Sequence, residues 1–432
     1  MSYLDKIVRE QKNNKAVGIT SICSANPQVL EASLRYAHNT GNVILVESTC
    51  NQVNQFGGYT GMTPAVFAAY ISDLAERIGF PNQRILIGGD HLGPSVWRKE
   101  TATSAMEKSR VLVRDYINAG YQKIHIDTSM CLGDDPQGQP LDPQKIAVRT
   151  ADLIAISEST FSQLGHQTNY IRYIIGTEVP PPGGIQGREE TALPTKPQTV
   201  RETIKLTRNA LDQHGLGSVW ERIIAIVVQP GVEYGNQKII DYNPEAAAGL
   251  KSLIESINGM VYEAHSTDYQ TRSALQHLVE DHYAILKVGP ALTFAYREAI
   301  YALTLIEEEL SVNHRDWQLS NIINTLEEVM LDNPEYWQEY YLGTEQMKKS
   351  SRHYSFSDRI RYYWPEKRVQ KSLNRLSNNL QNAEIPLSLL SQYLPDQFHN
   401  IRLGKLDNKP KSIIHDSISR VLLDYDFACG HG

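Results

Sequence analysis

Cysteine is scarce in this chain, with four residues in 432, and no two of them form a CxxC pair. Cys23, Cys50, Cys131 and Cys429 are therefore not expected to build a disulfide framework or a thiolate zinc site. A polybasic run is also lacking, and 42 basic against 49 acidic side chains give a formal charge of −7. This balance argues against a nucleic-acid partner or a membrane and favours a small soluble ligand.

Long apolar segments are missing as well. Nowhere do about 18 apolar residues run together, and the N-terminal stretch MSYLDKIVREQKNNK lacks the continuous apolar region of a secretory signal. We therefore expect a cytoplasmic protein without a membrane span. No GxGxxG motif follows a predicted strand, so a bound nicotinamide dinucleotide is not expected either.

Short apolar, β-branched runs recur through the first two thirds of the chain, and stretches between them carry apolar residues at three- and four-residue spacing, typical of amphipathic helices. Eight such runs predict a (β/α)8 TIM barrel, a fold of about 250 residues. An open doubly wound sheet is the alternative, because counting strands does not prove closure. The runs are AVGITSIC (16–23), NVILVE (42–47), RILIGGD (84–90), KIHID (123–127), YIIGTE (173–178), IIAIVVQ (223–229), MVYEAH (260–265) and AILKV (284–288).

The strand-like runs stop near residue 295, and only helical patterns follow. AYREAIYALTLIEEEL, NIINTLEEVML, KRVQKSLNRLSNNL and HDSISRVLLDYDF alternate with polar loops. We therefore predict a barrel over residues 1–295 and a helical C-terminal extension over residues 296–432 that packs on the barrel.

Polar side chains end the predicted strands, where loops at the C-terminal ends of barrel strands build the active site. One such residue alone is more often a helix cap or a packing residue than a ligand. Residues of this kind on one rim argue for a shared polar site. They are Glu47, Asp90, His91, Asp127, Glu178, Gln229, His265 and Lys287.

Two histidines with a carboxylate and an amide oxygen suit a borderline divalent ion, zinc above all, with manganese or nickel as alternatives. We predict His91, Glu178 and His265 as metal ligands, with Gln229 next in line. Asp90 is then available for proton transfer, and Asp127 and Glu178 are further candidate catalytic carboxylates. Adjacent strand residues face opposite sides, so Asp90 and His91 are expected to share a site only where the strand has ended.

Substrate contacts are predicted for Glu47, Lys287, Asp268, Arg359 and Arg361. The two arginines stand beside three aromatic residues in SDRIRYYWP (357–365), a composition able to hold a phosphate or a sugar. The alternative is an interface between extension and barrel. In the same way, the glycines before Asp90 admit either a close ligand or close strand packing.

Several blocks make the sequence similar to a known family. CSANPQVLEA, ESTCNQVNQFGGYTGMTP, GGDHLGP, GTEVPPPGG, VVQPGVEYG, YEAHSTDYQT, ILKVGPALTF, SDRIRYYWP and QYLPDQ closely resemble the Z subunits of D-tagatose-1,6-bisphosphate aldolase, the GatZ/KbaZ family. The likeness includes the helical extension.

This resemblance implies a partner protein that gives full activity and stability to the catalytic Y subunit of a class II aldolase in tagatose 6-phosphate, galactitol or N-acetylgalactosamine catabolism. Some relatives are described as metal-dependent epimerases that interconvert fructose and tagatose at C4, so an enzyme acting on a ketohexose or its phosphate is the alternative. Retro-aldol cleavage and re-addition would explain such inversion. A homo-oligomer is also possible from the sequence, which does not define the oligomeric state.

A more distant likeness to the class II aldolases themselves concerns the metal site. It implies that His91 and His265 bind zinc and that Asp90 moves the proton. Gln229 stands where those enzymes have a third histidine, and HSTD (265–268) replaces their glycine-serine phosphate loop. Both departures put aldolase activity by this chain alone in doubt.

Overall fold

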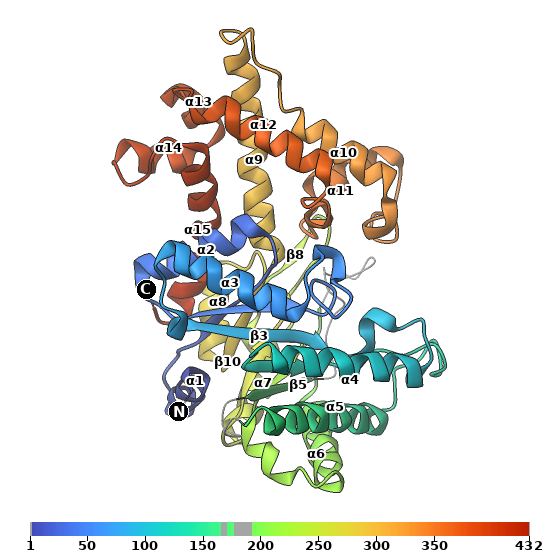
Figure 1. Ribbon diagram of the computed structural model, residues 1–432. Coiled ribbons are helices and arrows are strands. Elements are labelled where there is room, and N and C mark those ends of the chain that lie inside the picture. The colour runs from blue at the N-terminus through green and yellow to red at the C-terminus, as the bar shows by residue number, and fades with distance from the viewer. Residues whose placement is uncertain (1, 166–170, 177–191, 432) are drawn as a thin grey trace.

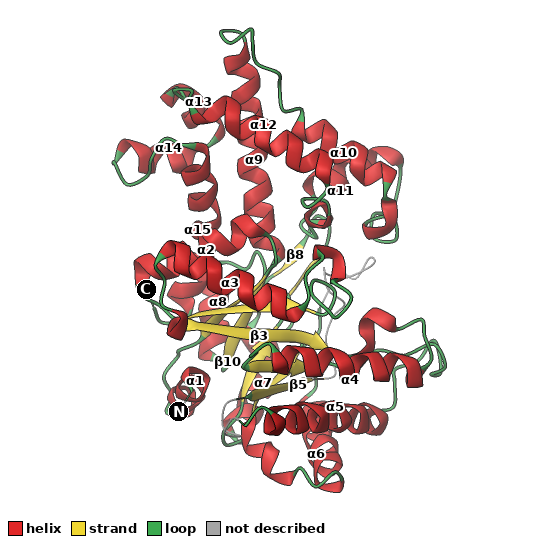
Figure 2. Cartoon of the chain, viewed as in Figure 1, coloured by secondary structure: helices red, strands yellow, loops and turns green. Residues whose placement is uncertain are grey.

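Eight parallel strands close into a barrel in the computed structural model, which describes residues 2–165, 171–176 and 192–431. Each predicted apolar run contributes one strand, so the predicted TIM barrel is confirmed (Figure 2). Around the barrel the order is β1-β10-β9-β6-β5-β4-β3-β2. The strands are β1 (Ile19–Cys23), β2 (Ile44–Thr49), β3 (Ile85–Leu92), β4 (Lys123–Ile126), β5 (Arg172–Gly176), β6 (Ile223–Val228), β9 (Val261–Ala264) and β10 (Tyr283–Val288).

Crossover helices follow seven of these strands and cover the outside of the barrel. Their starts are encoded locally, because a side-chain cap is often followed by proline at the first helical position, as with Asn26 before Pro27 and Thr63 before Pro64. The helices are α2 (Pro27–Thr40), α3 (Pro64–Ile78), α4 (Ala102–Asn118), α5 (Pro143–Gln163), α6 (Pro197–Gln213), α7 (Pro244–Glu255) and α8 (Arg272–Glu280).

An N-terminal helix, α1 (Tyr3–Lys12), covers the end of the barrel where the strands begin. Leu4, Ile7 and Val8 are buried in a cluster with strand residues that include Ile19 and Ile224. Because this end is filled with apolar side chains, the polar site can lie only toward the opposite end of the strands.

The C-terminal extension rises from the mouth of the barrel as a separate group of helices (Figure 1). Its first helix continues directly from β10 and points away from the barrel. The helices are α9 (Pro290–Ser311), α10 (Ile322–Asp332), α11 (Glu345–Tyr354), α12 (Lys367–Gln381), α13 (Leu387–Tyr393), α14 (Pro395–Arg402) and α15 (Pro410–Ala428). A short 3-10 helix, η6 (Arg359–Tyr362), and a two-stranded ribbon of β7 (Glu233–Tyr234) and β8 (Ile239–Ile240) lie near the mouth.

The last helix, α15, returns to the barrel and packs against α2, α8 and α9. Lys411 on α15 pairs with Glu31 on α2 at 2.8 Å, and Asp424 pairs with Arg272 on α8 at 2.6 Å. This is the position between the first and last crossover helices where an eighth barrel helix belongs. The helical layer is thus completed from within residues 296–432, which the sequence alone assigned to the extension.

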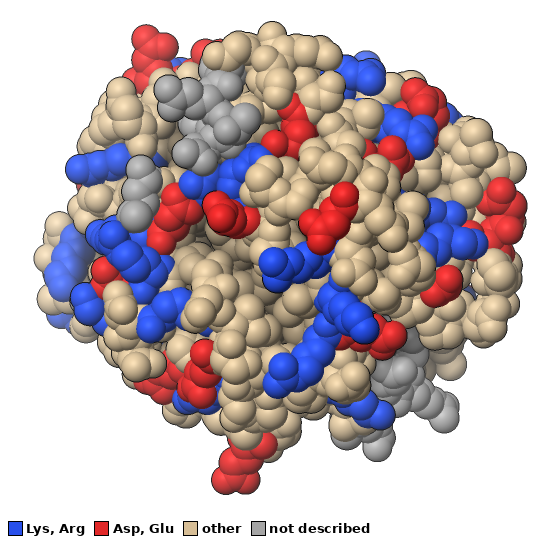
Figure 3. Space-filling view, turned by 90° about the horizontal axis from the view of Figure 1, so that it is seen from below, with Lys and Arg blue, Asp and Glu red and all other residues tan. Residues whose placement is uncertain are grey.

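The surface carries both signs of charge. On the face seen in Figure 3, basic and acidic side chains are interspersed. Among the described residues, no helix combines the length and the apolar character needed to cross a bilayer.

Candidate functional site

Asp90 and His91 both face the inside of the barrel because β3 is bulged at this point. We expected the strand to end before these two residues, but it continues to Leu92. Its pairing with β4 shifts register between Gly89 and Leu92. His91 takes up the extra residue with a left-handed φ of 50°. The bulge, and not the end of the strand, therefore allows Asp90 and His91 to share one site.

Three imidazoles meet around Asp90. Ring centroids are 4.9 Å apart for His91 and His265, 5.1 Å for His91 and His125, and 5.3 Å for His125 and His265. One donor atom from each of the four residues lies within 4.8 Å of the others, and all four residues are buried. The structure therefore brings together the predicted pair His91 and His265, and it adds a third histidine.

His125 was not predicted from the sequence, although the pattern contained a signal. Lys123, His125 and Asp127 alternate along and just beyond β4, so their side chains point to the same side. Glu263 and His265 alternate in the same way at β9. The prediction from sequence used only the polar residue at the end of each run. It therefore missed the polar residues two and four positions earlier, which lie on the same inward face.

Carboxylates contact all three imidazoles, and Nε2 of His265 lies 3.0 Å from Glu263 Oε1. Asp127 Oδ2 lies 2.8 Å from Nδ1 of His91, which leaves Nε2 of that ring free for a ligand. Nδ1 of His125 lies 2.8 Å from Asp90 Oδ1 and accepts the backbone N–H of His91 at 3.2 Å. The buried Nε2 of His125 has no hydrogen-bond partner in the described structure. Asp127 thus orients a ligand rather than lying at the centre of the cluster.

A network of ion pairs lies beneath the histidines. Lys123 Nζ is 2.7 Å from Glu47 and 2.6 Å from Glu263, and Lys287 Nζ is 2.7 Å from Glu47 and 2.9 Å from Asp90. Glu47, Lys123 and Glu263 are fully buried. Because Glu47 lies inside this network, its direct contacts are with the two lysines and with Ser21.

The network shifts the ionisation of the cluster. Burial raises the pKa of Asp90, but the charges of His91 and Lys287 outweigh it and hold the pKa well below its ordinary value. Burial lowers the pKa of His265 to about 4. Burial also lowers the pKa of His91, but Asp90 and Asp127 more than compensate, and its pKa is raised. Asp90 is therefore a carboxylate, and His265 is a neutral imidazole able to bind a cation.

Close packing explains Gly88. A Cβ at this position would lie 2.7 Å from Cγ of Glu47 and 3.3 Å from Cδ of Lys123. Glycine is required here because the buried ion pair passes directly against the backbone. Of the two alternatives for this glycine, the structure supports packing within the barrel.

The mouth above the cluster is formed jointly by the barrel and the extension. A small pocket there is lined by Lys287 and Asp268 from the barrel and by Arg361 and Tyr362 from η6. Asp268 Oδ1 accepts the backbone N–H groups of Gly289 and Ala291 at 2.9 and 2.8 Å and so caps α9. Burial raises the pKa of Asp268 to about 6.

Arg359 lies on another side of the cluster. It lines a cavity of about 410 Å³ that also reaches His91 and Asp127. Its Nη1 donates to the carbonyl of Tyr336 at 2.8 Å, and its guanidinium lies over the ring of Tyr340. The two arginines thus belong to the interface between extension and barrel and also line cavities beside the cluster.

Two further predicted metal ligands are not seen among the cluster residues described above, for different reasons. The amide oxygen of Gln229 accepts the backbone N–H groups of Gly231 and Val232 at 2.8 and 3.1 Å, so it holds its own loop. Glu178 falls outside the described residues, and its place is not described.

The donor set fits a divalent cation. Asp90, His91, His125 and His265 offer three imidazole nitrogens and a carboxylate oxygen close enough together to surround one ion. Glu47, Asp90 and Glu263 pair with only two lysines, Lys123 and Lys287, so this buried group has more carboxylates than ammonium groups. Imidazole nitrogen and carboxylate oxygen are ligands for such an ion.

The chain is similar to several known proteins over almost its whole length. D-tagatose-1,6-bisphosphate aldolase subunit GatZ of Klebsiella pneumoniae is 48% identical over 423 residues, 98% of each chain. The Salmonella gallinarum protein of the same name is 47% identical over 426 residues, 99% of each chain.

A solved structure from Sinorhizobium meliloti, described as a probable tagatose 6 phosphate kinase, is 40% identical with a TM-score of 0.86 and covers 95% of this chain and all of that one. Its described activity differs from the names of the curated relatives. The model of the D-tagatose-1,6-bisphosphate aldolase subunit GatZ/KbaZ-like family matches residues 4–430. The match runs from α1 to the end of α15. The chain therefore belongs to the GatZ/KbaZ-like family.

Proposed function

We propose that this chain is the Z subunit of a tagatose-1,6-bisphosphate aldolase in tagatose 6-phosphate, galactitol or N-acetylgalactosamine catabolism. In this role it binds the catalytic Y subunit and gives it full activity and stability. The observation that carries the proposal is the 47–48% identity to named GatZ subunits over almost the whole chain, extension included.

We further propose that the barrel of this chain holds a zinc ion. His91, His125 and His265 would bind it, and Asp127 would orient His91. Bound there, zinc supplies a Lewis acid for a substrate carbonyl oxygen. The excess of buried carboxylates over lysines supports a cation at this place.

The residues of the mouth suit a ketohexose phosphate. Asp90 is ionised and accepts a hydrogen bond from a substrate hydroxyl, while Lys287 and Arg361 offer positive charge on the wall of the same pocket. Glu47 contributes by holding Lys287 from below. Lys287 is paired with two carboxylates, and although its burial lowers the pKa, Asp90 and Glu47 raise it well above the ordinary value, so it binds as an ammonium group rather than attacking a carbonyl as an amine.

A second candidate function, a divalent-metal ketose 4-epimerase, is favoured by the completeness of the cluster within one chain. Asp90 would accept the proton of the C4 hydroxyl as the C3–C4 bond breaks, its electron pair remaining on the C3 fragment. Rotation of the released aldehyde and re-formation of the bond would invert C4 and return the proton. A subunit without chemistry of its own would not need three buried imidazoles around this carboxylate.

One experiment tests both functions. The purified chain is assayed alone and with a Y subunit for cleavage of tagatose 1,6-bisphosphate, and alone with added zinc, manganese or nickel for conversion of fructose, tagatose and their phosphates. A rise in the activity and thermal stability of the Y subunit is expected, and no effect on the Y subunit would refute the subunit role. Conversion by the chain alone, lost in Asp90→Asn, would establish the epimerase.

A further inference from the structure

A second cavity, of about 420 Å³, lies beside the mouth pocket and shares Cys23, Gln52, Tyr59 and Arg361 with it. It is enclosed between the barrel loop after β1, the start of α9, and helices α12 and α15 of the extension. Its volume is within the range of about 300–1,000 Å³ found for small-molecule sites. Neither the metal cluster nor the proposed reaction uses this space.

The far wall of this cavity is apolar and aromatic. Tyr296 and Trp364 meet edge to face there, with ring centroids 4.8 Å apart. Ile300, Leu303, Leu376 and Ile414 complete the wall. Such a surface favours a flat ring, which would be desolvated on both its face and its edge.

One buried donor on this wall has no partner. Trp364 is 3% exposed, and its indole Nε1 makes no hydrogen bond in the described structure. Leaving a buried N–H unpaired costs about 1–3 kcal/mol, so an acceptor on a bound molecule would be favoured at this position. The backbone carbonyl of the same residue is already used, because it accepts from Gln370 at 2.7 Å.

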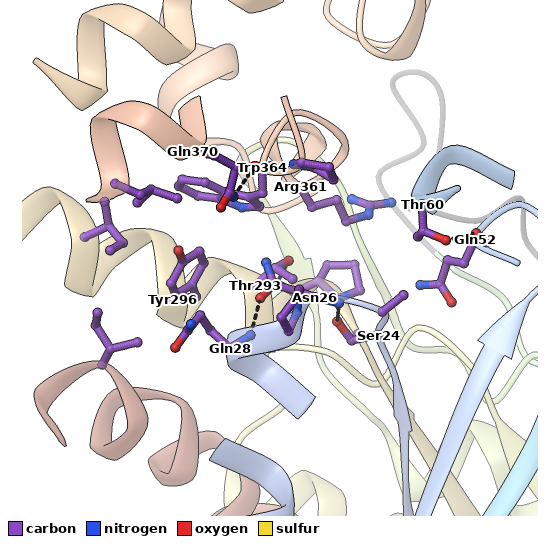
Figure 4. Close-up of a pocket in the computed structure, with 18 of the residues that line it drawn as sticks. Ser24, Asn26, Gln28, Gln52, Thr60, Thr293, Tyr296, Arg361, Trp364 and Gln370 are labelled. Carbon is purple, nitrogen blue, oxygen red and sulfur yellow. Dashed lines mark hydrogen bonds between the residues drawn. The ribbon is translucent and has the colours of Figure 1, made fainter. Parts of the chain in front are cut away.

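The near end of the cavity is polar and carries a positive charge. Figure 4 shows Arg361 beside Trp364 on one side of the cavity and Gln28 and Asn26 on the other, whereas Trp364 and Tyr296 are in contact and close the far end between them. Arg361 donates to the hydroxyl of Tyr362 at 2.9 Å, to the carbonyl of Asp358 at 3.1 Å and to the carbonyl of Ser357, and all three acceptors are neutral. Its charge is therefore available to an anionic group at this end.

We propose that this cavity is a second ligand site, separate from the metal cluster, for an aromatic or heterocyclic anion. The ring packs against Tyr296 and Trp364, a ring acceptor takes the indole N–H, and the anionic group lies beside Arg361. Because Arg361 also lines the mouth pocket, a molecule bound here changes the environment of that pocket. This inference goes beyond the proposed function and does not depend on it.

The test is a fluorescence titration of the folded chain with 8-anilinonaphthalene-1-sulfonate, an aromatic anion. Saturable binding at one site is expected, with the uncharged analogue N-phenyl-1-naphthylamine binding at least about tenfold more weakly for lack of the charge-assisted hydrogen bond to Arg361. The indole N–H is tested by displacing the dye with quinoline-3-carboxylate, an anion whose ring nitrogen is an acceptor. Trp364→Phe keeps a ring but removes the N–H, and it should weaken binding of this competitor about tenfold.

Two matched pairs of variants localise the site. Ser377 lines the cavity from an exposed position on α12, so Ser377→Trp should abolish binding, whereas Asn378→Trp, one residue along and outside the lining, should not. Trp317→Phe serves in the same way for Trp364→Phe. Near-UV circular dichroism confirms that each variant is folded. Absence of saturable binding to the folded protein, or undiminished binding by Ser377→Trp, would overturn the proposal.

Discussion

Replacement of Asp127 by asparagine tests the metal centre without removing a proposed ligand. The Asp127 carboxylate is buried and lies 2.8 Å from Nδ1 of His91, so it fixes the ring and makes Nε2 a better electron donor. Asparagine keeps the size of the side chain but loses the charge. Changes of this kind reduce metal affinity about 10–100-fold, which corresponds to roughly 1.4–2.7 kcal/mol of binding free energy.

The measurement is zinc affinity by competition with a chromophoric chelator, together with the zinc content of the dialysed protein. Asp135→Asn is the matched control, because Asp135 is another buried carboxylate soon after β4, but its partners are Arg149 and Lys145 rather than a histidine. The control should lower stability and leave zinc affinity unchanged. Equal zinc affinity of Asp127→Asn and the unaltered protein would refute the assignment of His91 as an oriented metal ligand.

Three further predictions concern stability. Glu47→Gln leaves Lys123 and Lys287 without their shared carboxylate and should lower the free energy of unfolding in urea by about 3–5 kcal/mol, and a loss below 1 kcal/mol would contradict the ion-pair network. Gly88→Ala should destabilise by at least about 1–3 kcal/mol because its Cβ would overlap Glu47, and a neutral effect in the same assay would show that the barrel yields there. Burial, with Lys411 and Arg35 nearby, lowers the pKa of His415 to about 4, below its unfolded value near 6.5, so unfolding takes up a proton and stability is lost as pH falls from 6.5 to 4. After allowance for partial exposure the loss is about 1–2 kcal/mol, and denaturation of His415→Gln should lack this acid-dependent part.

The barrel was predictable because the signals that define it are local. Each buried parallel strand appears as a short apolar run, and the helix PQVLEASLRYAHNT begins at Pro27 and ends at Thr40 as its pattern indicates. The place of α15 could not be read in this way. Its neighbours α2 and α8 lie far away along the chain, and no periodicity states which distant surface an amphipathic helix will cover.

The site was predicted in outline and corrected in detail. The strand-end rule placed His91 and His265 on one rim, and the structure brings them together. It could not reveal the bulge at His91, because the extra residue is visible only in the pairing with β4. The same rule also selected Gln229 as a ligand, although a polar residue after a strand can equally well hold a loop, as Gln229 does.

The position of α15 has a consequence for how the protein is made. A ribosome emits the polypeptide from its N-terminus, so every strand and the first seven crossover helices emerge before the helix that seals the gap between α2 and α8. Until α15 has been made, the apolar flank that Ile418 and Leu422 cover is open to water. Chains truncated before residue 410 should therefore be clients of chaperones and prone to aggregate.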